Sequence, residues 1–402
     1  MPTLRENLKA LPRPAWILFA GTFINRFGTF VMPFLVIYLT RRGYGMAESG
    51  AAVSAYGGGH LVASMLGGHL ADRIGRRNTI VLSMFASSIS MLALSQATAY
   101  GTILILTFFA GASAEMYRPA ATALIGDLVR PDQRIAAFGM YRWAVNLGFA
   151  AGPATAGFLA TKSFFYVFAG DAATSALFGV IAFTSLPHGL RSSMKDEQTG
   201  EAFVHAIRNR RFVLFLLATL CVTWIEFQLH STFPLYIQQL GFTTTTYGLL
   251  LSINGVMIVV FELMLTTWTQ RFDPQKIIAL GYALAAIGIA MTGLAHTIIE
   301  LAGTVVVWTL GEMVYAPVTG AYVTSLAPER YRGRYSGMWI LMWSMGMLLG
   351  PLLGTLIFQR RPAVLWMTCA IVGLAGAGLS LVKPSQPEQN TPECREAQSS
   401  SS

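Results

Sequence analysis

The chain has 402 residues, of which 54% are apolar and only 12% are charged, with a mean hydropathy of +0.53 and a net charge of +9. An ordinary soluble domain cannot hide this much apolar surface, so the composition excludes a soluble enzyme or binding protein and predicts an all-α polytopic membrane protein. The three cysteines have no paired spacing, which predicts neither a metal site nor a disulfide framework. No cofactor is expected.

Apolar windows of about 20 residues, the length that crosses a bilayer, occur twelve times along the chain. The first window is too long for the core of a signal peptide and has no small-residue cleavage site, so we interpret it as a spanning helix. The twelve predicted helices are 15–39, 47–71, 78–96, 102–126, 136–160, 164–186, 212–237, 246–269, 276–295, 298–326, 336–358 and 363–381.

The lysines and arginines predict the orientation of these helices, because such residues accumulate in cytoplasmic loops. With both termini inside, 20 of the 28 fall in cytoplasmic segments, 5 in outer loops and 3 inside helices. We therefore expect an integral protein of a bacterial inner membrane with both termini cytoplasmic. The positive charge is mostly an orientation signal, so no nucleic-acid partner is expected, and the protein is expected to be a monomer.

The chain divides into two similar halves. We predict an N-terminal six-helix bundle over 1–186, a cytoplasmic linker over 187–211, a C-terminal six-helix bundle over 212–382 and a disordered tail over 383–402. An offset of 198 residues relates the halves, which indicates a parallel repeat of six-helix units. The offset matches Arg73 with Arg271, Tyr117 with Tyr315, Pro119 with Pro317, and Gly152-Pro153 with Gly350-Pro351.

A charged turn, Gly68-His-Leu-Ala-Asp-Arg-Ile-Gly-Arg-Arg77, interrupts the apolar sequence between the second and third helices. Gly75 permits a turn backbone that a β-carbon would hinder. The pattern Gly-x-Leu-Ala-Asp-Arg-x-Gly-Arg-Arg resembles the signature of the major facilitator superfamily of transporters, and every position is filled. The resemblance implies twelve helices in two six-helix repeats.

A second pattern lies in the fifth helix, where Gly148, Gly152, Pro153 and Gly157 are spaced for close helix packing. It resembles the pattern of the antiporter branch of the superfamily, although packing alone also explains it. The sequence departs from the family at Thr107, which stands where an arginine is common one turn before Gly111.

The resemblance also implies a gate on the cytoplasmic side. A charge cluster there would bridge to the start of the eleventh helix near Ser336 in one conformation only, because a carboxylate favours a helix N-terminus. The candidate gating residues are Gly68, Asp72, Arg73, Gly75, Arg76, Asp127, Gly152 and Pro153.

An ionisable group in the middle of a bilayer costs at least ~2.5–3.5 kcal/mol, so each one is a candidate functional residue. The first half contributes Arg26, His60, Glu115, Arg118, Arg142 and Asp171. The second contributes Glu226, His230, Glu262 and Glu312. The second half therefore has three carboxylates and no arginine.

Glu115 and Arg118 are three residues apart on one helix face, which predicts an ion pair. Arg118 and Arg142 lie at similar depths, so one of them needs Glu115 or Asp171 as its partner. His60 is interpreted as a packing residue. Glu262 has no acidic counterpart in the repeat, so the sequence predicts no role for it beyond an interface.

Glu226 is the first candidate for the proton-carrying residue, followed by Glu312 and then Glu115. Burial disfavours the charged form of a carboxylate, as a proton carrier requires. His230 lies four residues after Glu226 and is expected on the same helix face, where it would tune the acid. The alternative is a neutral, hydrogen-bonded glutamate in the core.

Bulky, partly hydrophobic and cationic substrates are expected in a cavity between the halves, although an aromatic stripe is also consistent with packing. The candidate binding residues are Arg26, Phe27, Tyr117, Arg118, Arg142, Trp224, His230, Tyr315 and Trp339.

The predicted function is secondary active transport by alternating access. Proton-coupled efflux of hydrophobic or cationic small molecules is favoured over uptake by proton symport of a sugar, peptide or anionic metabolite held by Arg26 or Arg118. A lipid translocase is a further alternative. An enzyme is not expected, because the sequence carries no acyltransferase pair, metal cluster or phosphate loop and an enzyme leaves the repeat unexplained.

Overall fold

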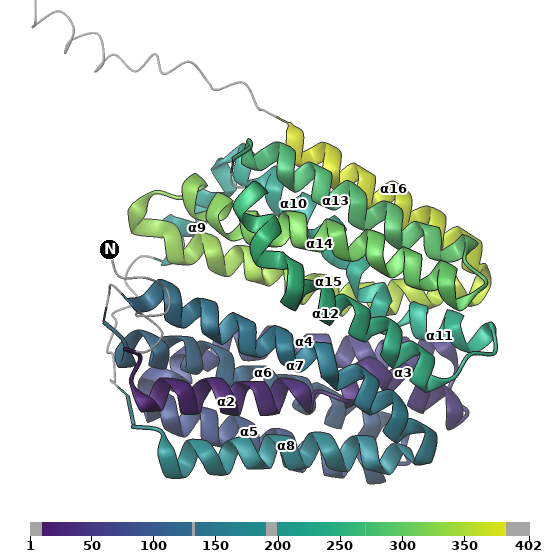
Figure 1. Cartoon of the computed structure of the whole chain (residues 1–402), viewed down its shortest axis with the longest axis horizontal. Coiled ribbons are helices and arrows are strands. Elements are labelled where there is room, and N and C mark those ends of the chain that lie inside the picture. Colours follow the sequence, from purple (N-terminus) through teal and green to yellow (C-terminus); the bar gives the residue numbers. More distant parts are fainter. Residues whose placement is uncertain (1–9, 131–132, 190–198, 270, 383–402) are drawn as a thin grey trace, which may run out of the picture.

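The computed structural model describes residues 10–130, 133–189, 199–269 and 271–382, which form two helical bundles (Figure 1). The first bundle contains α2 (Arg13–Phe27), α3 (Val31–Arg41), α4 (Met46–Ile74), α5 (Arg76–Gln96), α6 (Tyr100–Leu128), α7 (Arg134–Lys162) and α8 (Phe164–Ser185). The second contains α10 (Arg210–Glu226), the 3₁₀ helix η2 (Phe227–His230), α11 (Thr232–Gln239), α12 (Thr244–Thr269), α13 (Pro274–Met291), α14 (Ile298–Leu326), α15 (Arg332–Arg360) and α16 (Pro362–Leu381).

These elements form twelve membrane spans in the described part of the chain, so the predicted helix count is confirmed. Nine spans are long and apolar enough by length and composition to cross a membrane. The other three, α4, α6 and α7, are each 29 residues long. They are rich in glycine, alanine and polar residues because they pack against other helices, where small side chains allow close approach.

The first span is broken, although the sequence predicted one continuous helix. α2 ends at Phe27 and α3 begins at Val31. Pro33 is the third residue of α3, a position in the first turn where its missing N–H leaves no hydrogen bond unmade. The buried Asp171 of α8 accepts hydrogen bonds from the N–H groups of Phe30 and Val31, both at 3.1 Å. A side chain therefore satisfies the donors that the break exposes.

The seventh span breaks in the same way. α10 ends at Glu226, η2 follows, and α11 begins at Thr232 with Pro234 as its third residue. Gln228 spans the break by donating hydrogen bonds to the carbonyls of Trp224 and Gly350, both at 3.0 Å. The prediction of a continuous helix over 212–237 was therefore wrong in its middle.

The two bundles meet along α4 with α15 and α7 with α12. On the side that carries the predicted outer loops, the backbones approach closely. A β-carbon on Gly57 would lie 2.7 Å from the carbonyl of Met347, and one on Gly248 would lie 2.2 Å from that of Pro153. Tyr247 adds a hydrogen bond to the carbonyl of Pro33 at 3.1 Å. The outer side of the molecule is therefore closed.

We call the opposite side, predicted to be cytoplasmic, the inner side. There, Gly68 on α4 and Gly337 on α15 have open space where a β-carbon would be. Trp143 on α7 is 41% exposed, and Arg118 of α6 is 54% exposed at its side chain although it lies ten residues from the helix end. The halves are therefore apart on the inner side, as expected for one end state of alternating access.

The segment predicted as a linker contains the short helix α9 (Thr199–Arg208), which packs beside α10 and α15. His205 on α9 forms a hydrogen bond with the hydroxyl of Tyr335 at 2.9 Å. Residues 190–198 of this linker and the tail predicted over 383–402 lie outside the described residues.

The capping of the first-span break by Asp171 generates a stability prediction. Asp171→Ala removes the acceptor for two backbone N–H groups, each worth about 1–3 kcal/mol when left unpaired. We expect the purified protein to unfold several degrees lower in a thermal melt followed by tryptophan fluorescence. Asp171→Asn keeps an acceptor oxygen and should melt close to the wild type. Equal melting of wild type and Asp171→Ala would contradict the assignment.

Candidate functional site

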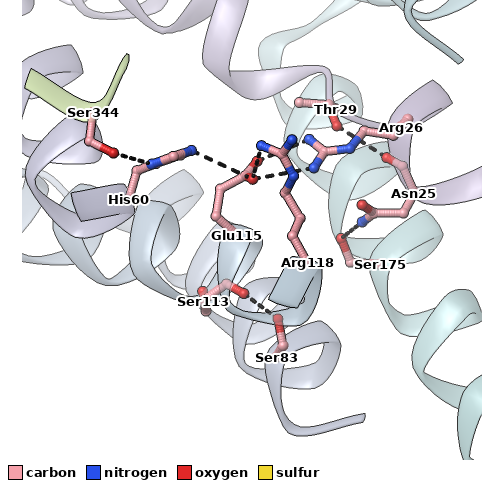
Figure 2. A network of polar contacts seen from close by, with 10 residues as sticks. All are labelled: Asn25, Arg26, Thr29, His60, Ser83, Ser113, Glu115, Arg118, Ser175 and Ser344. Carbon is pink, nitrogen blue, oxygen red and sulfur yellow. Dashed lines mark hydrogen bonds and ion pairs between the residues drawn. The ribbon is translucent and has the colours of Figure 1, made fainter. Parts of the chain in front are cut away.

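An ionic network occupies the middle of the N-terminal bundle (Figure 2). Glu115 of α6 accepts hydrogen bonds from Arg26 of α2 at 2.9 and 3.3 Å, and from Arg118 at 3.1 Å. The predicted Glu115–Arg118 pair is therefore confirmed, and Arg26 joins it. The side chains of Arg26 and Glu115 are 7% and 10% exposed, which makes this a largely buried pair in which the guanidinium offsets the desolvation of the carboxylate.

The same network reaches across to the second half. His60 of α4 lies with its Nε2 3.6 Å from Glu115 and its Nδ1 3.0 Å from the hydroxyl of Ser344 on α15 (Figure 2). His60 was predicted to be a packing residue, and the structure places it as the link between the ionic network and the C-terminal bundle.

A second inter-bundle contact joins α7 to α12. Arg142 forms an ion pair with Glu262, and Asn146 donates a hydrogen bond to the same carboxylate at 3.2 Å. Glu262 was predicted to have no role beyond an interface and is here the partner of Arg142, because opposite charges meet across the boundary. Asp171, the alternative partner considered for the arginines, instead accepts hydrogen bonds from the backbone of the first span.

The C-terminal bundle holds two partly buried carboxylates whose hydrogen bonds come from neutral groups. Glu226 accepts a hydrogen bond from the hydroxyl of Tyr315, and Glu312 accepts one from the side-chain amide of Asn254 at 2.8 Å. Tyr315 follows Glu312 by three residues on α14, which places both on one helix face. Glu226 and Glu312 are close enough for their charges to interact.

His230 does not occupy the predicted place beside Glu226. The expectation assumed a continuous helix, whereas the chain becomes a 3₁₀ helix directly after Glu226, and this change rotates the following residues. His230 instead packs near Phe227, with ring centres 6.2 Å apart, and its Nδ1 has no hydrogen-bond partner among the described residues.

A narrow pocket, too tight in this conformation to admit a water molecule, lies beside the carboxylates. Tyr315, which donates to Glu226, is part of its wall together with Trp339, and both residues were predicted to bind substrate. The pocket is lined by Thr219, Val222, Thr223, Tyr282, Tyr315, Thr319, Trp339 and Trp343. The indole N–H of Trp339 is buried and has no partner among the described residues, so a donor is free at the pocket wall.

The other predicted binding residues are less accessible. Tyr117 is fully buried and Trp224 is 9% exposed. Phe27 ends α2 where α7 crosses it, and a β-carbon on Gly152 would lie 2.6 Å from the carbonyl of Phe27. Close packing at Gly148 and Gly152 is therefore a role that the structure gives to the glycine pattern of the fifth helix.

Six of the eight predicted gating residues lie at the inner ends of α4, α5 and α6, whereas Gly152 and Pro153 lie on α7. Gly75 has φ +92°, a conformation that favours glycine, so the expected turn is confirmed. Arg76 forms an ion pair with Asp127 and donates to the carbonyl of Ala123 at 2.6 Å. Asp72 and Arg73 are exposed. The bridge from this cluster to the start of α15 stays a prediction.

The charges of the two halves differ in kind. Two guanidinium groups and an imidazole surround the single carboxylate Glu115, whereas Glu226 and Glu312 have neutral partners. No group of three or more acidic, histidine or cysteine side chains that would hold a metal ion occurs among the described residues. Glu226 and Glu312 therefore lack the neutralising positive charge that Glu115 has.

The family model described as Major Facilitator Superfamily matches residues 18–258 and 231–401. An uncharacterized MFS-type transporter, YqjV of Bacillus subtilis (strain 168), is 26% identical over 79% of this chain and 80% of its own length. A Na(+), Li(+), K(+)/H(+) antiporter of Planococcus maritimus is 23% identical over 78% of this chain and 81% of its own.

A shorter match covers the quinolone resistance protein NorA of Staphylococcus aureus, with 29% identity over 37% of this chain and 38% of that protein. Among solved structures, a POT family transporter in complex with 5-aminolevulinic acid is 19% identical, with TM-score 0.75 over 92% of this chain and 95% of that one. A D-xylose-proton symporter is 16% identical, with TM-score 0.75 over 91% and 96%. These structures share the fold.

The Arg142–Glu262 contact can be measured by a double-mutant cycle. Arg142→Gln and Glu262→Gln should each lower the free energy of unfolding in mixed micelles, because each leaves the other charge without its ion-pair partner. The double variant should lose less than the sum of the two, with a coupling energy of about 0.5–3 kcal/mol. Strictly additive losses would show that the two side chains do not interact in solution.

Proposed function

The chain belongs to the major facilitator superfamily of transporters, and on that premise we propose that it exports hydrophobic or cationic small molecules in exchange for protons. Glu226 carries the proposal. It is a partly buried carboxylate within a membrane-spanning segment, and its hydrogen bond comes from the neutral hydroxyl of Tyr315. A carboxylate in this setting gains from binding either a proton or a cation, because either one neutralises its charge.

Exchange follows from competition at that carboxylate. When the pocket beside Tyr315 and Trp339 widens and a cationic substrate binds there, the charge of the substrate favours the ionised form of Glu226, and the proton leaves. When a proton returns, the neutral acid no longer attracts the cation. Glu312 is the second candidate for the same role. It lies one turn before Tyr315 on α14 and accepts a hydrogen bond from Asn254.

Glu115, the third proton-coupling candidate, fits the role less well. Arg26, Arg118 and His60 all lie against its carboxylate, and two adjacent guanidinium groups stabilise the ionised form. We therefore assign Glu115 to the framework of the N-terminal bundle.

In this proposal, alternating access moves the substrate from the cytoplasm to the outside. The outer side is closed by backbone contacts between the bundles, and the inner side is open, so a substrate would reach the pocket from the cytoplasm. The residues at Gly68, Asp72, Arg73, Arg76 and Asp127 would close the inner side in the opposite state. Gly152 and Pro153 lie at the outer contact that must then open.

Two of the relatives support antiport over uptake. The Planococcus maritimus relative is a Na(+), Li(+), K(+)/H(+) antiporter, and the Staphylococcus aureus relative is a quinolone resistance protein. Thr107 stands where the family commonly carries an arginine, and in this proposal the proton coupling depends on the C-terminal carboxylates instead.

The proposal is tested with Glu226→Gln, which mimics the protonated acid and keeps an acceptor for Tyr315. Efflux of a fluorescent cation against its gradient should be abolished in proteoliposomes, whereas downhill exchange of the same cation should persist. Glu201→Gln is the matched control, because this glutamate lies on α9 with a side chain that is 70% exposed, and its loss should leave efflux unchanged.

Undiminished active efflux in Glu226→Gln, still collapsed by a protonophore, would move the coupling site away from Glu226. Uptake that rises with an inward proton gradient in the wild type would instead favour symport.

A further inference from the structure

One part of the N-terminal bundle has more buried hydrogen-bond donors than it has acceptors for them among the described residues. Arg118 donates to Glu115 through Nη1, which uses one of the five N–H groups of its guanidinium. The Nε of Arg26 and the hydroxyls of Tyr117 and Tyr141 are buried and have no hydrogen-bond partner among the described residues. Buried donors without partners are rare in folded proteins and call for an explanation.

These donors lie together. Both hydroxyls are near enough to Arg26 and Arg118 to interact with them electrostatically. The guanidinium carbon of Arg26 lies 5.5 Å from the ring centre of Tyr117. Tyr117 and Tyr141 are 0% and 9% exposed, and Arg26 is 6% exposed. Tyr117, Tyr141 and Arg26 are therefore held in place by the surrounding protein.

Arg118 opens this group toward the space between the bundles. Its side chain is 54% exposed. The outward face of α6 is marked by Phe109, which is 56% exposed. Arg118 follows Phe109 by nine residues, or two and a half turns, so it lies on the opposite face. Figure 2 shows Arg118 beside Glu115, whose other neighbour His60 reaches Ser344 of the C-terminal bundle.

The repeat indicates what kind of group such a tyrosine binds. Tyr117 corresponds to Tyr315 at the offset of 198 residues, and both are almost fully buried. The hydroxyl of Tyr315 donates to the carboxylate of Glu226. The hydroxyl of Tyr117, in a setting with two arginines and one carboxylate, has no such acceptor among the described residues.

Resting on the proposed function, we propose that Arg118, Tyr117 and Tyr141 form a subsite for an anionic group of the substrate, in the first place a carboxylate. A carboxylate accepts hydrogen bonds and donates none, which matches a site composed of donors with one excess positive charge. The substrates favoured by this transporter are then amphoteric. Their anionic group contacts the N-terminal bundle, and their basic or aromatic part contacts the pocket beside Glu226.

Two rhodamine dyes that differ only at one group test this inference. One is a zwitterion with a free carboxylate, and the other is its methyl ester, a cation without the acid. Binding to the purified full-length protein is measured by fluorescence anisotropy, which does not depend on proton coupling. Arg118→Gln should weaken binding of the acid about tenfold, the loss expected for one charge-assisted contact. Binding of the ester should change little.

The variants contain their own controls. Glu115 keeps Arg26 and His60 as neighbours in Arg118→Gln, and retained binding of the ester shows that the variant is folded. Tyr141→Phe removes only a hydroxyl and should lower the acid-to-ester affinity ratio by a smaller factor. Arg271→Gln removes a positive charge at the exposed inner end of the C-terminal bundle and should leave the ratio unchanged.

An acid-to-ester ratio that is the same in wild type and Arg118→Gln overturns the subsite and leaves the proposed function standing. If the wild type binds the ester dye but not the acid dye, the subsite is likewise overturned and the proposed function still stands. If the wild type binds neither dye, hydrophobic or cationic substrates are contradicted. The proposed function then fails together with the inference.

Discussion

The structure depends on how ionisable groups are tolerated in the middle of a membrane. Each needs a partner, because the low-dielectric interior penalises an isolated charge. The N-terminal bundle meets this requirement with charge, by placing Arg26, Arg118 and His60 around Glu115. At Glu226 and Glu312, the C-terminal bundle meets it with the neutral donors Tyr315 and Asn254. Glu115 therefore belongs to an ionic network, whereas Glu226 and Glu312 are the acids to which we assign proton exchange in our proposal.

The contacts between the halves follow from the same constraint. On the outer side the bundles join through close backbone packing at glycines, whereas toward the middle they join through polar pairs, His60 with Ser344 and Arg142 with Glu262. Polar pairs can separate when water enters, because water replaces the lost hydrogen bonds. These polar pairs are therefore the contacts between the bundles that hydration can weaken.

The sequence predicted the twelve helices, the repeat, the Gly75 turn and the Glu115–Arg118 pair, because hydropathy, glycine and local helical spacing act over short distances. It did not predict the breaks before Pro33 and Pro234, and the misplaced His230 follows from the second break. The Arg142–Glu262 pair joins residues 120 apart, and Asp171 reaches a backbone 140 residues away. Contacts of this kind depend on how the bundles pack, which local spacing does not encode.

The central claim is that a carboxylate of the C-terminal bundle exchanges a proton for substrate. The most direct measurement adds a permanently charged lipophilic cation to the purified protein in weakly buffered detergent near neutral pH, with a soluble pH indicator. The account predicts that binding releases up to about one proton per protein molecule, since a bound cation favours the ionised acid. Saturable binding of the cation with no proton release at any pH where the protein is folded would contradict it.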